Sequence, residues 1–462
     1  MILPAELTTR LEGQLGARGL AEFEACLDGE SKPGLRLNTL KGQVPELTEL
    51  LPFRLEPVPW APAGFVFPIE ERPGKLPFYQ AGLYYLQEPS AMAPAAVLDV
   101  KPGERVLDLC AAPGGKTTQL ASAMAGVGLL VANDNNQKRM KALIWNLEHW
   151  GATNAVAVNE EPERLSAAFP GYFDRILVDA PCSGEGMLRK DPKALAGWRK
   201  HNGRVCRETQ DRLLDQAAAM LAPGGKMVYS TCTFNPLENE EAVAAFLERQ
   251  PAFRLLPLPL YDGWRADPLL KGCRQLWPHL ADGEGQFLAL MEKAGSSPAA
   301  GESGEGAAKT RRDRAGSIPK PGGGETPGEI EPFFSFMEEN FNYPLKGPFA
   351  IFNGHVYRTP ADLPDMSGLR VARPGWYLGL IRNGRFYPSQ PLAMGMDAKQ
   401  MKRRLDLEPG GEDVERYLRG ETLMTAGEKG WTLVTLAGFP LGFGKQTGDY
   451  IKNEYASGWR LI

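Results

Sequence analysis

Between residues 100 and 292, short apolar runs alternate with longer segments whose apolar positions recur at helical spacing. Runs of four or five residues between polar or turn-forming residues are typical of strands buried on both faces. They predict strands at residues 105–109, 128–132, 155–158, 175–178 and 226–230. Helical spacing predicts helices at residues 116–125, 137–150, 208–221 and 238–248, the third stopped by a Pro-Gly-Gly turn at 223–225, and a closing hairpin follows at 276–277 and 286–291. This alternation predicts a parallel α/β sheet.

The segments that flank this region have different patterns. Residues 1–99 mix helical patches with Pro-rich stretches, and residues 36–40 predict a strand. Residues 294–329 are rich in Gly, Ser, Pro and charge and predict a flexible linker, because so few apolar residues cannot offset the cost of ordering. The basic centre of this linker, at residues 309–314, is a solvated spacer or a weak RNA tether. Residues 330–462 carry many turn signals and predict one or two small β or α+β modules. We therefore expect an N-terminal domain at 1–99, a core at 100–293, a linker at 294–329 and a C-terminal region at 330–462.

Composition narrows the class of protein. The chain has 462 residues, 43% of them hydrophobic and 23% charged, which is ordinary for a globular protein. None of the six cysteines forms a CxxC pair and the four histidines are scattered, so we expect reduced thiols and no metal site. The N-terminus lacks a secretory signal and no apolar run reaches about 18 residues, so we expect a cytoplasmic, monomeric protein outside the membrane. The net charge of −4 argues against nucleic-acid binding unless basic residues gather on one face.

The first candidate site is a glycine-rich turn between the first predicted strand and helix, Leu107-Asp-Leu-Cys-Ala-Ala-Pro-Gly-Gly-Lys116. In open α/β sheets, ligands bind beyond the carboxyl ends of the strands. The turn has neither GxGxxG nor Walker spacing, so a dinucleotide or a nucleoside triphosphate is not the first choice. Asp134 follows the second strand, 19 positions beyond Gly115, where a carboxylate suits a ribose. Together they predict an adenosyl ligand, although a tight turn with a solvated aspartate explains the same residues equally well.

Two cysteines follow other predicted strands. Asp179-Ala-Pro-Cys182 ends the fourth strand and Ser230-Thr-Cys232-Thr ends the fifth. A single buried cysteine is most often an inert small hydrophobe. Two cysteines at the same edge of one sheet, one of them after Asp-Ala-Pro, indicate a catalytic role instead.

The residue types suit methylation of a pyrimidine at carbon 5. A thiolate that adds to carbon 6 makes carbon 5 nucleophilic, and the covalent route divides one difficult step into easier ones. A carboxyl beside the ring, which Asp179 would provide, can hydrogen-bond the ring nitrogen and the exocyclic amine. A second thiol can assist release of the enzyme.

In combination, these motifs resemble the Sun-type RNA 5-methylcytosine methyltransferases, and within that family the RsmF type of ribosomal RNA methyltransferase. The resemblance extends to Gly34-Leu-Arg-Leu-Asn-Thr-Leu40 and, more weakly, to Gly458-Trp-Arg460. It implies a Rossmann-like class I methyltransferase core with an N-terminal α+β RNA-recognition domain and a C-terminal PUA-like RNA-binding region.

The resemblance also implies residue roles. Cys232 would be the nucleophile, Cys182 the release helper, and Asp179 a contact for both cofactor and cytosine. Asp134 would take the ribose, and Glu161, with Glu160 as its neighbour, would lie near the adenine. The S-adenosylmethionine pocket would be lined by Cys110, Ala111, Ala112, Pro113, Gly114, Gly115 and Lys116.

The substrate that the resemblance implies is RNA, and the first expectation is small-subunit ribosomal RNA. A transfer RNA substrate keeps the same chemistry, and a catalytically silent RNA-binding assembly factor keeps the same fold. DNA or a small molecule is disfavoured by the flanking modules. Lys190 and the basic run at residues 399–404 are candidate RNA contacts, but a solvated lysine and a solvated helix face explain them equally well.

Overall fold

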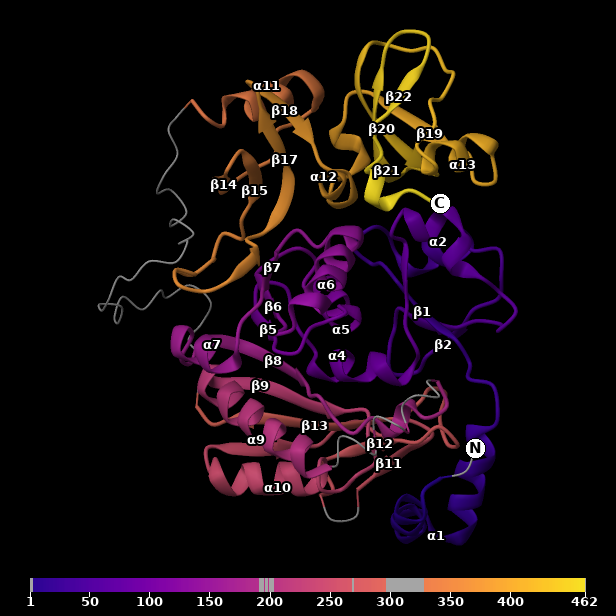
Figure 1. Cartoon of the computed structure of the whole chain (residues 1–462), viewed down its shortest axis with the longest axis vertical. Coiled ribbons are helices and arrows are strands. Elements are labelled where there is room, and N and C mark those ends of the chain that lie inside the picture. Colours follow the sequence, from indigo (N-terminus) through magenta and orange to yellow (C-terminus); the bar gives the residue numbers. More distant parts are fainter. Residues whose placement is uncertain are drawn as a thin grey trace.

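The computed structural model describes residues 3–190, 195, 198, 203–267, 270–295 and 328–461. Its centre is a ten-stranded sheet of order β11-β12-β13-β9-β8-β5-β6-β7-β16, with β10 paired to β13 (Figure 1). The parallel strands are β5 (Arg105–Asp108), β6 (Leu129–Asn133), β7 (Ala155–Val158), β8 (Phe173–Asp179) and β9 (Leu221–Thr231). Antiparallel strands extend one edge: β10 (Phe253–Leu256), β11 (Trp264–Ala266), β12 (Arg274–Leu276) and β13 (Gln286–Lys293).

Helices cover both faces of this sheet. Alternate side chains of a strand point to opposite faces, so Val106 packs with one set of helices and Leu107 with the other. The first set is α4 (Ala93–Leu98), α5 (Gly115–Ala123) and α6 (Gln137–Trp150). The second set is α7 (Pro162–Ala168), α9 (Gly203–Met220) and α10 (Glu240–Arg249). The predicted Rossmann-like α/β core is thereby confirmed.

One predicted boundary in the core is wrong. The helix expected at residues 208–221 ends at Met220, and β9 begins at once with Leu221, which pairs with Phe173. The Pro-Gly-Gly turn at 223–225 therefore lies within the bounds of β9, where the pairing shifts register between Phe173 and Arg175. Tertiary pairing to β8 outweighs the local breaker signal.

The N-terminal module is a small sheet of order β2-β3-β1-β4 with short helices. Its strands are β1 (Gly34–Leu37), β2 (Glu56–Pro57), β3 (Gly64–Val66) and β4 (Tyr84–Leu86). Its helices are α1 (Ala5–Leu27), α2 (Val44–Glu49), η1 (Pro73–Lys75), α3 (Pro77–Gln80) and η2 (Ser90–Met92). The strand predicted at 36–40 stops at Leu37, because the Asn38 side chain turns inward and donates to the carbonyl oxygens of Gly82 and Trp150, both at 2.8 Å.

The C-terminal region forms two further modules, as the turn signals predict. The first contains α11 (Glu331–Asn340), β14 (Phe349–Phe352), β15 (His355–Arg358), β17 (Trp376–Arg382), β18 (Arg385–Pro388) and α12 (Gln390–Gly395). The second contains η4 (Ala398–Gln400), β19 (Arg404–Leu407), α13 (Glu412–Leu418), β20 (Gly430–Leu436), β21 (Phe439–Gln446), β22 (Ile451–Asn453) and η5 (Ser457–Trp459). Between β15 and β17 in sequence, β16 (Val371–Arg373) leaves the first module and pairs with β7 at the edge of the central sheet, a contact that the sequence did not predict.

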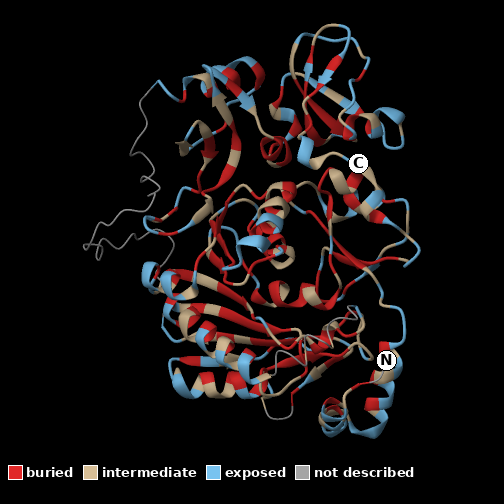
Figure 2. Ribbon diagram, viewed as in Figure 1, coloured by how far each residue is buried: buried red, intermediate tan, exposed pale blue. Residues whose placement is uncertain are grey.

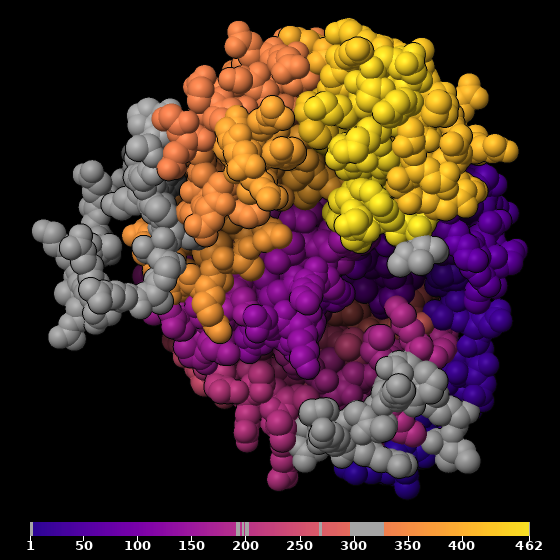
Figure 3. Space-filling view, turned by 45° about the horizontal axis from the view of Figure 1, so that its top comes forward, coloured from indigo at the N-terminus to yellow at the C-terminus, as the bar shows by residue number. Residues whose placement is uncertain are grey.

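The N-terminal module and the last C-terminal module pack against each other. Leu35 and Phe65 of the N-terminal module share one hydrophobic cluster with Tyr417 and Leu441 of the last module. Figure 2 shows buried residues running through both modules and the central sheet, and Figure 3 shows a hollow where the N-terminal, core and C-terminal parts of the chain meet. Most of the predicted linker, with its basic centre, lies outside the described residues. Within the described part of the chain, no helix combines the length and the apolar character needed to cross a bilayer.

Candidate active site

The glycine-rich turn lies between β5 and α5, at the carboxyl edge of the sheet. Its backbone is held by neighbouring strands, since the Ala111 N–H donates to the Asn133 carbonyl oxygen at 2.7 Å. Gly114 caps α5 with φ of 114°, in the left-handed region that only glycine adopts without strain. The local sequence therefore builds an open turn whose backbone a ligand can approach.

A cavity of about 140 Å³ lies on one side of this turn, lined in part by Cys110, Asp134, Asn135 and Glu161. Asp134 is buried, and its carboxylate accepts from the backbone N–H groups of Ala112 (3.2 Å) and Asn136 (2.9 Å). Its orientation is thus fixed by the turn and by the start of α6. This cavity joins the predicted ribose carboxylate to the predicted cofactor turn.

The two adjacent glutamates after β7 have different surroundings. Glu161 lines the cavity and accepts from the Asn135 side-chain amide at 3.0 Å. Glu160 is buried and accepts from the Arg370 backbone N–H at 2.9 Å, and its carboxylate also pairs with the Arg370 side chain at 3.3 Å. Glu160 therefore ties the C-terminal region to the core, while Glu161 faces the cavity.

A second cavity, of about 190 Å³, lies on the other side of the turn and shares Cys110 with the first. The Lys116 ammonium Nζ lies 2.8 Å from the Asp179 Oδ2 in this cavity. Burial opposes the charge on Lys116, but the Asp179 carboxylate outweighs it and raises the pKa of Lys116. Lys190, at the rim of the same cavity, is brought near the site.

Asp108 lines the second cavity and was not predicted from the sequence. It is buried, and burial raises its pKa to about 7. Its Oδ2 accepts from the Thr117 hydroxyl at 2.7 Å, whereas its Oδ1 is buried and has no hydrogen-bond partner. An unpaired buried carboxylate oxygen that lines a cavity suits a cationic ligand group.

The two predicted thiols face each other. The Sγ atoms of Cys182 and Cys232 lie 3.3 Å apart, with both cysteines free and partly exposed. Asp179, which lines the second cavity, precedes Cys182 by three residues, and its Oδ1 accepts at 2.8 Å from the hydroxyl of Ser230, two residues before Cys232. The hydrogen bond to Cys232, together with burial, raises the pKa of Cys182 well above its usual value. Cys182 therefore keeps its proton at neutral pH and can donate it toward the Cys232 sulfur.

The loops that carry the thiols pack too closely for any side chain larger than hydrogen at Gly186. The Gly186 N–H donates to the Cys232 carbonyl oxygen at 2.8 Å. A Cβ atom at Gly186 would lie 2.9 Å from that oxygen and 3.0 Å from the Gly285 carbonyl oxygen. Only glycine permits this approach.

Glu238 connects the loop of Cys182 with the loop of Cys232. Its carboxylate accepts from the Ser183 N–H at 2.9 Å, the Ser183 hydroxyl at 2.6 Å and the Gln210 amide at 3.1 Å. The Ser183 hydroxyl also bonds the Thr233 hydroxyl at 2.8 Å. Residues on both sides of the thiol pair are thus held in one buried network.

Helix α1 braces the same loops from a distant part of the sequence. Arg10 forms an ion pair with the buried Glu185, at the start of η3 (Glu185–Met187), and donates to the Phe234 carbonyl oxygen at 3.1 Å. Glu185 in turn accepts from the Phe234 N–H at 3.1 Å, and Gln14 donates to the Phe234 carbonyl oxygen at 3.0 Å. The backbone N–H and carbonyl oxygen of Phe234, two positions after Cys232, are therefore both held by side chains from outside the Cys232 loop. The motif around Cys182 could have pointed to Glu185, but no sequence signal points to Arg10.

The basic run at residues 399–404 does not form one continuous helix face, because Lys399 and Gln400 lie on a short 3₁₀ helix and Arg404 begins a strand. It spans the short η4 turn and the start of β19, and Arg403 pairs with Glu428 at 2.9 Å. It is not among the residues that line either cavity at the turn. Within the described ranges, no group of three or more His, Cys, Asp or Glu side chains could hold a metal ion.

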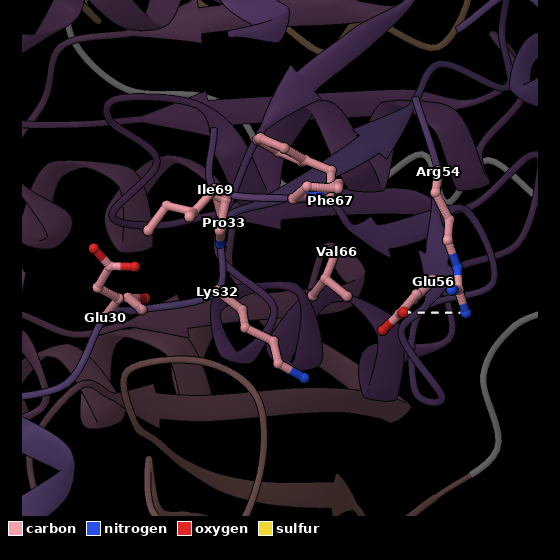
Figure 4. Close-up of a pocket in the computed structure, with 10 residues that line it drawn as sticks. Glu30, Lys32, Pro33, Arg54, Glu56, Val66, Phe67 and Ile69 are labelled. Carbon is pink, nitrogen blue, oxygen red and sulfur yellow. Dashed lines mark ion pairs between the residues drawn. The ribbon is translucent and has the colours of Figure 1, made fainter. Parts of the chain in front are cut away.

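A separate hollow of about 340 Å³ lies on the N-terminal module, between Lys32 and Phe67 (Figure 4). Arg54 and Glu56 pair at 3.3 Å on one side of it, as the dashed line shows. None of the predicted site residues lines this hollow, so it is distinct from the thiol site.

Comparison with known proteins covers nearly the whole chain. Residues 95–292 match the family model for the 16S rRNA methyltransferase RsmB/F, and residues 3–89 match the N-terminal domain of 16S rRNA methyltransferase RsmF. Residues 335–396 match the RsmF rRNA methyltransferase first C-terminal domain, and residues 404–461 match the methyltransferase RsmF PUA domain.

Similar proteins agree with these matches. The chain is 31% identical to ribosomal RNA small subunit methyltransferase F of an Escherichia coli O81 strain, over 98% of this chain and 95% of that one. It is 34% identical to the protein of the same name from Klebsiella pneumoniae, over 94% and 91%. A solved methyltransferase homologue from Pyrococcus horikoshii is 31% identical with a TM-score of 0.56, covering 63% of this chain and 95% of that one. The chain therefore belongs to the RsmF family of ribosomal RNA methyltransferases.

Proposed function

We propose that this protein transfers a methyl group from S-adenosylmethionine to carbon 5 of a cytosine in small-subunit ribosomal RNA, with Cys232 as the covalent nucleophile. The observation that carries the chemistry is the thiol pair, 3.3 Å apart, on the loops that follow Asp179 and Ser230, which are hydrogen-bonded to each other, with Asp179 also paired to Lys116 beside the glycine-rich turn. The substrate class rests on membership of the RsmF family, whose members named above are 16S rRNA methyltransferases. A ribosomal RNA substrate also supports a cytoplasmic location.

The residues around the turn fit S-adenosylmethionine. Asp134 and Glu161 line one cavity with oxygen atoms suited to ribose hydroxyls and an adenine amine. In the other cavity, the unpartnered Oδ1 of Asp108 suits the ammonium of the methionine moiety. The bound cofactor supplies a methyl group on a positively charged sulfur. Cys110, at which both cavities meet, lies where the two halves of such a ligand would join.

The thiol pair can perform the addition to cytosine. In this proposal the Cys182 S–H is the donor in the contact between the two sulfur atoms, and it stabilises the Cys232 sulfur as Cys232 gives up its own proton to solvent and attacks. A bond then forms between the Cys232 sulfur and carbon 6, while the Asp179 carboxylate, held by Lys116, accepts a hydrogen bond from the exocyclic amine. Electron density moves to carbon 5, which would bond to the methyl group as the bond between that methyl and the cofactor sulfur breaks, leaving a neutral thioether.

Release reverses the addition. Carbon 5 loses its proton to a base, and the bond between carbon 6 and the Cys232 sulfur breaks. Cys182 hydrogen-bonds the departing thiolate from 3.3 Å. This division of roles makes Cys182 the residue on which turnover depends after methyl transfer.

Variants of the two cysteines test this assignment. Cys232→Ala should reduce methyl transfer to small-subunit ribosomal RNA by at least about 10³-fold with cofactor binding retained. Cys182→Ala should accumulate a covalent protein–RNA adduct on denaturing gels. An adduct in the Cys182→Ala/Cys232→Ala double variant would show that another residue attacks.

The substrate is tested by mapping 5-methylcytosine with bisulfite after reaction in vitro. Naked ribosomal RNA, ribosomal subunits and transfer RNA should be offered separately to the full-length protein. Methylation confined to transfer RNA would overturn the substrate assignment while leaving the chemistry intact.

A further inference from the structure

The sheet of the first C-terminal module has one packed face and one open face. Val356, Leu378 and Phe386 point to α11 and α12 and join the hydrophobic cluster of that module. The opposite face carries a row of residues that crosses all four strands. Each residue of the row is the register partner of the next. The row is Phe352, His355, Leu380 and Tyr387. None of the hydrophobic clusters of the described residues includes a member of this row.

A second row on the same face is also aromatic. Tyr357 and Tyr377 are register partners, and their ring centroids lie 5.1 Å apart. The Tyr357 ring lies 6.0 Å from Phe352, and the His355 Nδ1 forms a hydrogen bond with the Tyr377 hydroxyl at 2.9 Å. Tyr387, at the outer edge, is 44% exposed. The open face therefore carries several connected rings, of which Tyr387 is exposed, Phe352, His355 and Tyr377 are half-buried, and Tyr357 is buried.

The charge on this face is positive although the whole chain carries −4. Arg382 and Arg385 are register partners at the β17–β18 hairpin, both exposed, and they follow the row of Leu380 and Tyr387 on the same face. The four strands contain no aspartate or glutamate. Arg373 lies over the Tyr377 ring at 6.0 Å, but its charge is shared with Glu148 at 2.9 Å. The free positive charge is therefore concentrated at the hairpin end of the aromatic rows.

We infer that this open face binds a single-stranded segment of RNA, with bases against Phe352 and Tyr387 and phosphates at Arg382 and Arg385. Aromatic platforms bordered by basic side chains bind unpaired nucleotides because every base has a stacking face and every linkage a negative charge. A base-paired duplex hides its base faces and would meet only the arginines. An apolar protein partner would leave the two arginines without a counterpart. The inference rests on the proposed RNA substrate and adds a contact remote from the thiols.

Binding of a fluorescein-labelled short oligouridine to the full-length protein, followed by fluorescence anisotropy, tests the inference. Tyr387→Ala and the Arg382→Ala/Arg385→Ala double variant should each weaken the Kd by about tenfold. Phe334→Ala is the matched aromatic control, because Phe334 is 38% exposed on α11, an element packed against the other face of the sheet. Arg18→Ala is the charge control, since the Arg18 side chain is 93% exposed on α1. Both controls should bind as the unmodified protein does, and the melting temperatures of all variants should agree.

Three outcomes overturn the inference. Unchanged oligouridine binding in both sets of variants excludes the face as an RNA site. An equal loss of affinity for duplex RNA means that charge alone acts there, without stacking. If the variants bind oligouridine as before but no longer capture ribosomal proteins from purified subunits, the face is a protein interface. Methyl transfer by the unmodified protein, measured separately, decides the proposed function independently of this face.

Discussion

The glycine-rich turn and the thiol pair lie at the carboxyl edge of the same sheet, but the chain builds them in different ways. The turn is one continuous stretch, from Asp108 to Lys116, braced nearby by the Thr117 hydroxyl bound to Asp108 and from 79 residues away by Arg36, which donates to the Gly115 carbonyl oxygen. The thiol pair joins two loops 50 residues apart, and helix α1 braces it from 224 residues away through Arg10. Changes remote in sequence should therefore disturb the thiols much more than the turn. The predictions below test that difference.

The largest effect is expected from breaking the brace between α1 and the thiol loop. In Arg10→Ala the buried Glu185 loses its charged partner, so the Phe234 backbone and with it Cys232 should shift. A misplacement of about 1 Å typically costs on the order of 10²-fold in rate, so kcat should fall by about that factor while cofactor KM stays unchanged. Steady-state kinetics of methyl transfer measure both.

Arg18→Ala is the control on the same helix, since the exposed Arg18 pairs only with its neighbour Glu22. Arg10→Lys keeps the charge and should recover part of the lost kcat. If Arg10→Ala raised the cofactor KM and left kcat unchanged, α1 would support the glycine-rich turn. The proposed brace of the thiol loop would then be wrong.

A smaller effect, confined to the cofactor, is expected at the turn. Glu161→Gln keeps the shape of the side chain but removes a charge from the cavity beside Asp134, so the Kd for S-adenosylmethionine should rise by about tenfold. Isothermal titration calorimetry measures this Kd directly. Glu160→Gln should instead lower the melting temperature, because it weakens the pair with Arg370, and leave the Kd unchanged. The reverse pattern would show that Glu160, and not Glu161, contributes to cofactor binding in this cavity.

The smallest effect concerns pH and stability at Asp108. Burial raises the pKa of Asp108 to about 7, against about 3.9 for an exposed aspartate. Between those values the folded protein holds a proton that the unfolded chain has lost, so this group makes stability fall as pH rises from about 4 to about 7. Asp108→Asn removes that dependence. The difference in melting temperature between this variant and the unmodified protein should therefore be more favourable to the variant at about pH 8 than at about pH 5. Equal differences at both pH values would contradict the raised pKa.

Local signals predicted some elements to the residue. The helix at 137–150 and the strand at 155–158 have the predicted bounds. The Asn136 side chain caps the helix by accepting from two backbone N–H groups, and Gly151 ends it in the left-handed conformation. Where capping and patterning agree, the neighbouring sequence suffices.

Signals failed where a partner came from elsewhere in the chain. The breaker at 223–225 did not prevent β9 from starting at Leu221, because β8 offered a pairing edge. Strand β16 reaches β7 from the C-terminal region, a pairing that no local pattern marks. The choice between Glu160 and Glu161 likewise depended on Arg370, more than 200 residues away.

By itself, the sequence determined the α/β core, the glycine-rich turn and the placing of both cysteines at strand ends, because hydrophobic periodicity and turn chemistry act over a few residues. The tertiary structure decided the 3.3 Å approach of the sulfur atoms, the brace from α1 and the open aromatic face of the β14–β18 sheet. These features depend on which side chains meet across long loops, and the spacing along a chain does not encode such distances.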